Sequence, residues 1–150
     1  MSDSTSGAGR PRPSGSANSG PGSSASRREA RERALELAYE AELRQATVDE
    51  ILATLLVSPE YFAIELLRAA EAERGKADGL IEQYAKGWSL ARMAVVDRLV
   101  MRLAVAEMLS LSTPTGVILS EAVELVGRYS TDESSRFVNG VLAAIARDVR

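Results

Sequence analysis

The sequence predicts an all-α fold of six to seven helices, preceded by a disordered N-terminal tail. Apolar residues recur at helical spacing from residue 26 to the end of the chain, which is the primary sign of amphipathic helices. The sequence has neither the alternating pattern of a half-buried strand nor an internal repeat of 20 to 50 residues. A chain of 150 residues can bury one sizeable core, so residues 26–150 are expected to form one helical domain.

Residues 1–25 differ from the rest of the chain in composition. Ser, Gly, Pro and other small residues make up almost all of this segment, and Met1 is its only large apolar residue. Such a segment cannot offset the entropy lost on ordering, which predicts a disordered tail. Arg10 and Arg12 within it would attract RNA only weakly, so a plain spacer is the preferred interpretation.

The first helix is expected at about residues 27–45. Ser26 followed by Glu29 has the pattern of a capping box, in which the hydroxyl and the carboxylate each accept a free backbone N–H. Ala34 and Leu37 belong to an apolar stripe that continues along the segment.

Five later segments continue the helical pattern. A short second helix is expected after Thr47, and residues 58–88 carry Gly75 and Gly79, which predict a kink or a break into two helices. The most apolar run predicts the central helix, the next helix has Ser120 as its plausible cap, and the last helix follows a polar stretch. These three segments are VVDRLVMRLAVAEMLSL, VILSEAVELVGRYS and RFVNGVLAAIARDV.

Composition excludes several classes of function. The chain contains no cysteine and no histidine, which excludes disulfides, thiolate nucleophiles, zinc sites of the Cys/His kind and a Ser-His-Asp triad. Carboxylate catalysis and an oxygen-liganded magnesium site stay open from composition, although we expect no metal, no cofactor and no catalytic residue. The formal net charge of -3 means that any nucleic acid must be held by a local patch. No apolar run is long enough for a membrane span, and we expect a cytoplasmic protein.

Three arginines, called here the arginine cluster, stand where the first helix begins. On a wheel of about 100° per residue, Arg27, Arg28 and Arg31 fall within one arc of about 100°. The start of a helix is electropositive, so each cation there costs roughly a few tenths of a kcal/mol. Phosphate groups of RNA would supply the missing anion. From the residues alone, a solvated face with Arg31 paired to nearby glutamates is the more usual outcome.

Three segments resemble, in the same order, the NusB family of bacterial transcription antitermination factors. They are the arginine-rich opening helix, WSLARMAVVDRLVMRLAVAEML and EAVELVGRYSTDESSRFVNGVL. The resemblance implies a fold of two small helical sub-bundles and a non-enzymatic RNA-binding adaptor. Similar proteins pair with NusE, a small-subunit ribosomal protein, and capture the single-stranded boxA element of nascent ribosomal RNA for the transcription elongation complex. Family members occur as monomers and as homodimers.

The resemblance also assigns RNA contacts to residues. It places the arginine cluster on RNA and gives a role to Phe137 and Glu133 near the start of the last helix. Phe137 would stack on an unpaired base, and Glu133 would accept a hydrogen bond from a base edge. Family members commonly carry aspartate at the position of Glu133. Arg136 is expected to contact phosphate because it is next to Phe137, with a simple surface arginine as the alternative.

Four further residues are expected to be structural. Trp88 is expected to fill the junction between the sub-bundles, with base stacking as the less favoured alternative. Asp97, at the head of the central helix, is expected to cap it. Asn139 is expected to bond a neighbouring loop, and Gly140, a costly residue inside a helix, to permit close approach of another helix.

Two other functions compete with the adaptor. An RNA-binding accessory domain of a ribosomal RNA methyltransferase-like protein would accompany a catalytic cysteine and a glycine-rich cofactor loop, and this sequence has neither. A purely protein-binding helical module would bind its partner without RNA.

Overall fold

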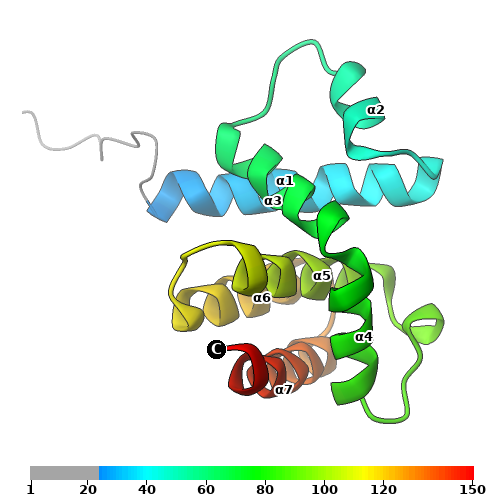
Figure 1. The fold of residues 1–150 in the computed structure, drawn as a ribbon, viewed down its shortest axis with the longest axis vertical. Helices are drawn as coiled ribbons and strands as arrows, with labels where there is room; N and C mark the ends of the chain where they lie inside the picture. Colours follow the sequence, from blue (N-terminus) through cyan, green and yellow to red (C-terminus); the bar gives the residue numbers. More distant parts are fainter. Residues whose placement is uncertain (1–23) are drawn as a thin grey trace, which may run out of the picture.

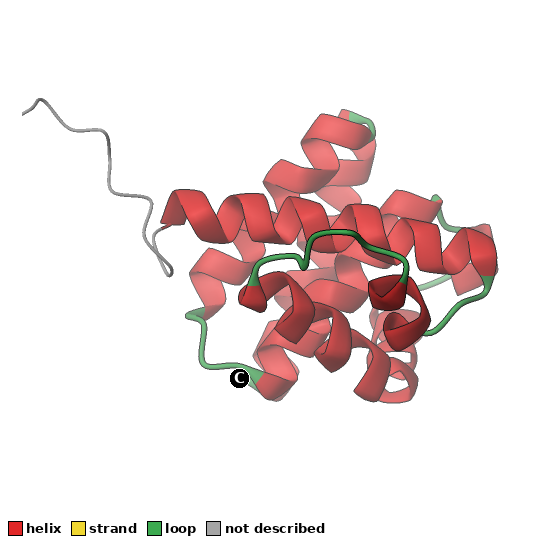
Figure 2. Cartoon of the chain, turned by 90° about the horizontal axis from the view of Figure 1, so that it is seen from above, coloured by secondary structure: helices red, strands yellow, loops and turns green. Residues whose placement is uncertain are grey.

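The computed structural model describes residues 24–150 as a set of helices around one central helix (Figures 1 and 2). This part of the chain contains no strand, which confirms the all-α prediction. The predicted tail lies outside the described residues, apart from the last two residues of 1–25. The elements are α1 Ser24–Arg44, α2 Val48–Ala53, α3 Tyr61–Ala72, α4 Arg74–Tyr84, η1 Leu90–Arg92, α5 Val95–Ser110, α6 Thr115–Tyr129 and α7 Asp132–Val149.

The central helix α5 is the middle of the core. All residues from 99 to 108 are buried, and α1, α3, α4, α6 and α7 pack against this helix. Figure 1 shows α1, α2 and α3 on one side of the molecule and α5, α6 and α7 on the other, with α4 joining the two groups. A helix covered on several sides must be apolar on several sides, which explains why α5 contains the most apolar run of the sequence.

Two predicted features of the N-terminal half are confirmed. The side-chain oxygen of Thr47 accepts the backbone N–H of Glu50 at 3.1 Å and so caps α2. The long segment does break into two helices, α3 and α4. The break lies at Glu73, and Gly75 and Gly79 are both inside α4.

Two predicted helix starts are wrong. The helix α1 already includes Ser24, so Ser26 lies inside it, where its hydroxyl donates to Glu60 Oε1 on the chain before α3. Similarly, α6 begins right after Pro114, and the Ser120 hydroxyl donates to the carbonyl of the preceding turn. Both serines satisfy their hydroxyls within the fold instead of capping a helix.

The last helix begins earlier than predicted. Thr131 is its N-cap and accepts the backbone N–H of Ser134 at 3.2 Å. Asp132 and Glu133 follow in the first turn, where negative charge is favourable. The polar stretch before Phe137 is therefore helical. In the whole described chain, no helix is long and apolar enough to cross a membrane.

Candidate nucleic-acid interface

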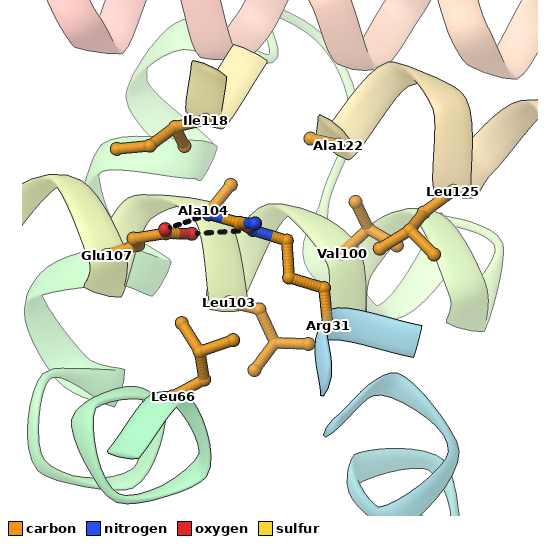
Figure 3. A pocket seen from close by; sticks show the side chains of 9 residues that line it. All are labelled: Arg31, Leu66, Val100, Leu103, Ala104, Glu107, Ile118, Ala122 and Leu125. Atoms are coloured by element: carbon orange, nitrogen blue, oxygen red, sulfur yellow. Dashed lines mark hydrogen bonds and ion pairs between the residues drawn. The ribbon is translucent and has the colours of Figure 1, made fainter. Parts of the chain in front are cut away.

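The arginine cluster does not form one surface, because Arg31 is buried. Only 6% of Arg31 is exposed, and its Nη2 lies 2.5 Å from Glu107 Oε1 on α5. Figure 3 shows apolar side chains of α3, α5 and α6 around this pair. The remaining cavity is about 20 Å³, room for about one water molecule. The prediction that Arg31 is available to RNA is wrong.

The position of Arg31 on α1 explains its burial. Ala34, Leu35 and Ala38 follow at i+3, i+4 and i+7, so Arg31 belongs to the face that packs on the core. A guanidinium is tolerated there only when an opposite charge and hydrogen bonds compensate for lost hydration. Glu107 supplies the opposite charge and accepts the hydrogen bonds, so the ion pair links α1 to α5.

Arg28 is exposed but already has anionic partners on α6. Its Nε and Nη2 donate to the two carboxylate oxygens of Glu121 at 3.2 and 3.0 Å. Nη2 also lies 3.2 Å from Glu124 Oε2. The hydrogen bond with Glu121 raises the pKa of Arg28 above its ordinary value. An RNA phosphate would therefore have to compete with two carboxylates for this guanidinium.

Arg27 is held by an aromatic ring. Its guanidinium lies 4.9 Å from the centroid of Phe62, and that of Arg31 lies 5.0 Å from the same centroid. Within residues 24–150, Arg27 has no carboxylate partner. Of the arginine cluster, Arg27 thus has the charge most available to a phosphate.

Phe137 and Trp88 form an aromatic pair at the start of α7. Their ring centroids are 6.3 Å apart and their planes meet at 62°. Phe137 is half-buried, whereas Trp88, in the connection between α4 and η1, is 55% exposed. Trp88 does not fill a junction between sub-bundles, so that prediction is wrong. Ala85 before Trp88 and Met93 after η1 are both buried in the core, whereas Trp88 between them lies at the surface.

Glu133 and Arg136 lie with Phe137 on one face of α7. The spacing i, i+3, i+4 brings the three side chains to the same side of the helix. Glu133 and Arg136 are exposed, and neither has an ion pair in the described part of the chain. The structure thus brings together the predicted residues of α7.

Asp97 does not cap α5. The N-cap is Ala94, and Asp97 is the third residue of the helix, 5% exposed, with its Oδ1 lacking a hydrogen-bond partner. The prediction of capping is wrong because the helix begins two residues before Asp97.

Asn139 and Gly140 are exposed on the outer face of α7, so both packing predictions are wrong. A Cβ added at Gly140 would meet no atom within 4 Å, and Asn139 makes no side-chain hydrogen bond among the described residues. Val138 and Leu142 are buried and make the core contacts instead.

Sequence reasoning missed Glu107 as the partner of Arg31. One signal was available: Glu107 is an ionisable residue inside the most apolar run of the sequence. Burying its charge without a partner would be costly, so a buried cation was to be expected nearby. The residues that the structure describes contain no cluster of three or more carboxylates suited to a metal ion.

Comparison with known proteins identifies the family. The model of the NusB family matches residues 28–147. The transcription antitermination protein NusB of Acidothermus cellulolyticus is 47% identical over 125 residues, covering 79% of this chain and 86% of that protein. The NusB protein of Saccharopolyspora erythraea is 43% identical over 127 residues, covering 80% of this chain and 86% of its own length.

Solved structures agree with the sequence comparison. NusB of T. maritima superposes with a TM-score of 0.73 at 35% identity, covering 81% of this chain and 91% of that one. A structure of the antitermination factors NusB and NusE in complex with dsRNA matches with a TM-score of 0.71 at 28% identity, covering 84% of this chain and 99% of the matched chain. The protein described here belongs to the NusB family.

Proposed function

We propose that this chain is a non-enzymatic RNA-binding adaptor that, with NusE, binds the boxA element of nascent ribosomal RNA and promotes transcription antitermination. The observation that carries the proposal is the similarity, over 84% of the chain, to a NusB solved with NusE and RNA. The relatives reported above are antitermination proteins, so the methyltransferase accessory domain and the protein-only module are not favoured. We place this activity in the cytoplasm, on the transcription elongation complex.

We further propose how the RNA surface is divided. Arg27 and Arg28 on α1 and Arg136 on α7 contact phosphates. Phe137 stacks on an unpaired base, and Glu133 accepts a hydrogen bond from a base edge. Arg27 has no carboxylate partner among the described residues, and the α7 residues share one face; both observations support this assignment.

Fluorescence anisotropy of labelled boxA RNA, titrated with and without NusE, tests the proposal. We expect preference over a scrambled single strand and over a duplex of the same sequence, and tighter binding with NusE. Three phosphate contacts predict a slope of about -2 in log K against log salt for a single strand. Equal, negligible binding of all three RNAs even with NusE would overturn the proposal and favour the protein-only module.

The best variant for this test changes Arg27 and Arg136 to Glu and leaves Arg28 and Arg31 intact, because these two arginines are paired with carboxylates of α6 and α5. Arg31 must be spared because loss of its buried ion pair would unfold part of the protein and mimic lost binding. An Arg44→Glu variant serves as the matched control, since Arg44 is an exposed arginine at the opposite end of α1, paired only with Glu40. It should retain RNA affinity at moderate salt.

A homodimer is a separate proposal for the free protein. Sedimentation velocity over a range of concentrations, with and without RNA, tests it. A dimer that uses the RNA surface would dissociate when RNA is added, whereas a monomer at all concentrations would reject it.

A further inference from the structure

We infer that Trp88 is a second base-stacking residue, so that the bound strand passes from Phe137 onto the connection between α4 and η1. The inference rests on the proposed function and adds a residue and a direction to the RNA path. Trp88 is the only tryptophan of the chain and is 55% exposed. Its indole contacts Phe137, whose ring lies 6.3 Å away between centroids.

The charge around Trp88 fits a phosphate backbone. Residues 85–93 contain Lys86 and Arg92 and no carboxylate, although the whole chain has a net charge of -3. Both side chains are exposed, and neither has an ion pair in the part of the chain that the structure describes. Most other arginines of the described chain have carboxylate partners. Residues 85–93 are therefore one of the few segments whose positive charge is not compensated by a carboxylate.

The positive charge continues along α7. Residues 134–147 carry Arg136 and Arg147 and no carboxylate. Arg147 and Lys86 line the same open hollow, of about 570 Å³, between the ends of α4 and α7, together with Asp148, whose carboxylate accepts the hydroxyl of Tyr84. The aromatic pair is therefore flanked by cations from two segments that are far apart in the sequence.

The ring geometry shapes the path of the strand. Planes that meet at 62° cannot both carry one straight stack of bases. Two unpaired bases that stack on Phe137 and Trp88 must be turned relative to each other, which a single strand permits and a duplex does not. The pair therefore selects unpaired RNA.

RNA fits this surface better than a protein partner does. Tryptophan, phenylalanine and arginine are common in protein interfaces as well, but lysine is depleted there, and aromatic faces beside cations without carboxylate partners are the usual platform for single-stranded nucleic acid. We therefore assign the surface to RNA and make NusE the competing outcome of the test.

The single tryptophan makes the inference directly measurable. The full-length protein is titrated with a short boxA RNA while tryptophan emission and the anisotropy of the labelled RNA are followed together. We expect emission to be quenched in step with binding. Trp88→Ala should weaken RNA binding about 5- to 150-fold, the range measured for single stacked bases, and Trp88→Phe should restore most of the affinity.

Two control variants separate stacking from folding and from general charge. Leu56→Ala removes an apolar side chain that is even more exposed than Trp88, in the connection between α2 and α3, and should bind RNA as the unchanged protein does. Lys86→Glu should weaken binding, whereas Lys76→Glu, another exposed lysine without an ion pair, should weaken it less.

The possible failures are distinguishable. If no RNA binds even with NusE, the proposed function falls and this inference falls with it. If RNA binds but emission is unchanged, or Trp88→Ala binds as tightly as the unchanged protein, the inference alone is overturned. If NusE without RNA quenches Trp88 and RNA does not, the surface belongs to the protein partner.

Discussion

The two halves of the proposed RNA surface use their charged groups differently. At the start of α1, Arg28 and Arg31 are already paired with carboxylates, and the pair of Arg31 is buried. At the start of α7, Arg136 has no ion pair within the described residues, and the rings of Phe137 and Trp88 meet at the surface. The charged groups at the start of α1 therefore mainly hold helices together, whereas those at the start of α7 are available to bind RNA.

An arginine-rich helix start is therefore not by itself a cationic surface that is available to RNA. Carboxylates of α5 and α6 supply the anions that sequence reasoning assigned to RNA. We expect changes at the α1 end to alter stability first, and changes at the α7 end to alter RNA affinity first.

The largest expected effect is on stability at the α1 end. Arg31→Ala leaves Glu107 buried without a partner, and we expect the free energy of unfolding to fall by about 3–5 kcal/mol. Urea unfolding followed by circular dichroism measures it. Arg33→Ala, which removes an exposed pair with Glu36, should cost less than about 1 kcal/mol. Equal losses in the two variants would remove the distinction between the ends.

The double change Arg31→Met with Glu107→Leu sharpens the same point. Replacing a buried ion pair by apolar side chains of similar volume is often neutral or stabilising. We therefore expect the double variant to be several kcal/mol more stable than Arg31→Ala alone, by roughly the same 3–5 kcal/mol. A double variant as unstable as the single one would mean that the hydrogen-bond geometry, and not charge compensation, holds α1.

The next effect is on RNA affinity at the α7 end. Phe137→Leu keeps apolar volume against the core but removes the flat ring, so we expect binding to weaken by about 1–3 kcal/mol. Stability should change by less than about 1.5 kcal/mol. Anisotropy and urea unfolding of the same sample measure both quantities. Unchanged RNA affinity would move the binding platform away from Phe137.

A smaller effect tests the outer face of α7. Gly140 is exposed inside the helix with free space around its Cα, so Gly140→Ala should raise stability by about 0.5–1 kcal/mol. Gly75→Ala, inside α4 with similar space, is the matched variant. Lost RNA affinity in Gly140→Ala alone would show that the RNA backbone approaches α7 closely there.

A still smaller effect concerns the carboxylates that compete for Arg28. Glu124→Gln removes one of its anionic partners while Glu121 still holds the side chain. We expect RNA binding to tighten by a few tenths of a kcal/mol. The effect should be larger at low salt, because added salt screens the interactions of surface charges. Glu40→Gln, at the far end of α1, should leave affinity unchanged at moderate salt. Weaker binding by Glu124→Gln would contradict the competition.

The smallest expected effect is pH-dependent. The hydrogen bond from the Tyr129 hydroxyl to Glu32 raises the pKa of Tyr129 above its ordinary value of 10.0. A raised folded-state pKa means that the stabilisation is present below pH 10 and is lost as the pH rises through the folded value. Unfolding free energies of the unchanged protein and Tyr129→Phe should therefore converge in alkaline solution. If the difference in unfolding free energy between the two proteins stayed constant as the pH rises, the hydrogen bond between Tyr129 and Glu32 would not contribute to stability.

Helix content and the central position of α5 could be predicted from the sequence because both depend on local information. Helical spacing of apolar residues repeats within a few positions, and the most apolar run must be the most covered helix. The family resemblance added Phe137 and Glu133, and the position of Arg136 next to Phe137 added the third residue; the structure places all three on one face of α7. Helix starts were less accurate, as Ser26 and Ser120 show, because a serine bonds to whatever partner the fold brings near.

Three properties follow from the order of the residues alone: the chain is helical, it lacks the residues of several catalytic and metal sites, and it resembles one family. Which arginines lack a carboxylate partner, and which aromatic rings lie at the surface, depends on how the helices pack. Arg31 and Glu107 are 76 residues apart, and no local pattern reports that they meet. Availability depends on which distant carboxylates and side chains the fold brings alongside, since burial and ion pairing are set by the packing of helices and not by the period of one helix.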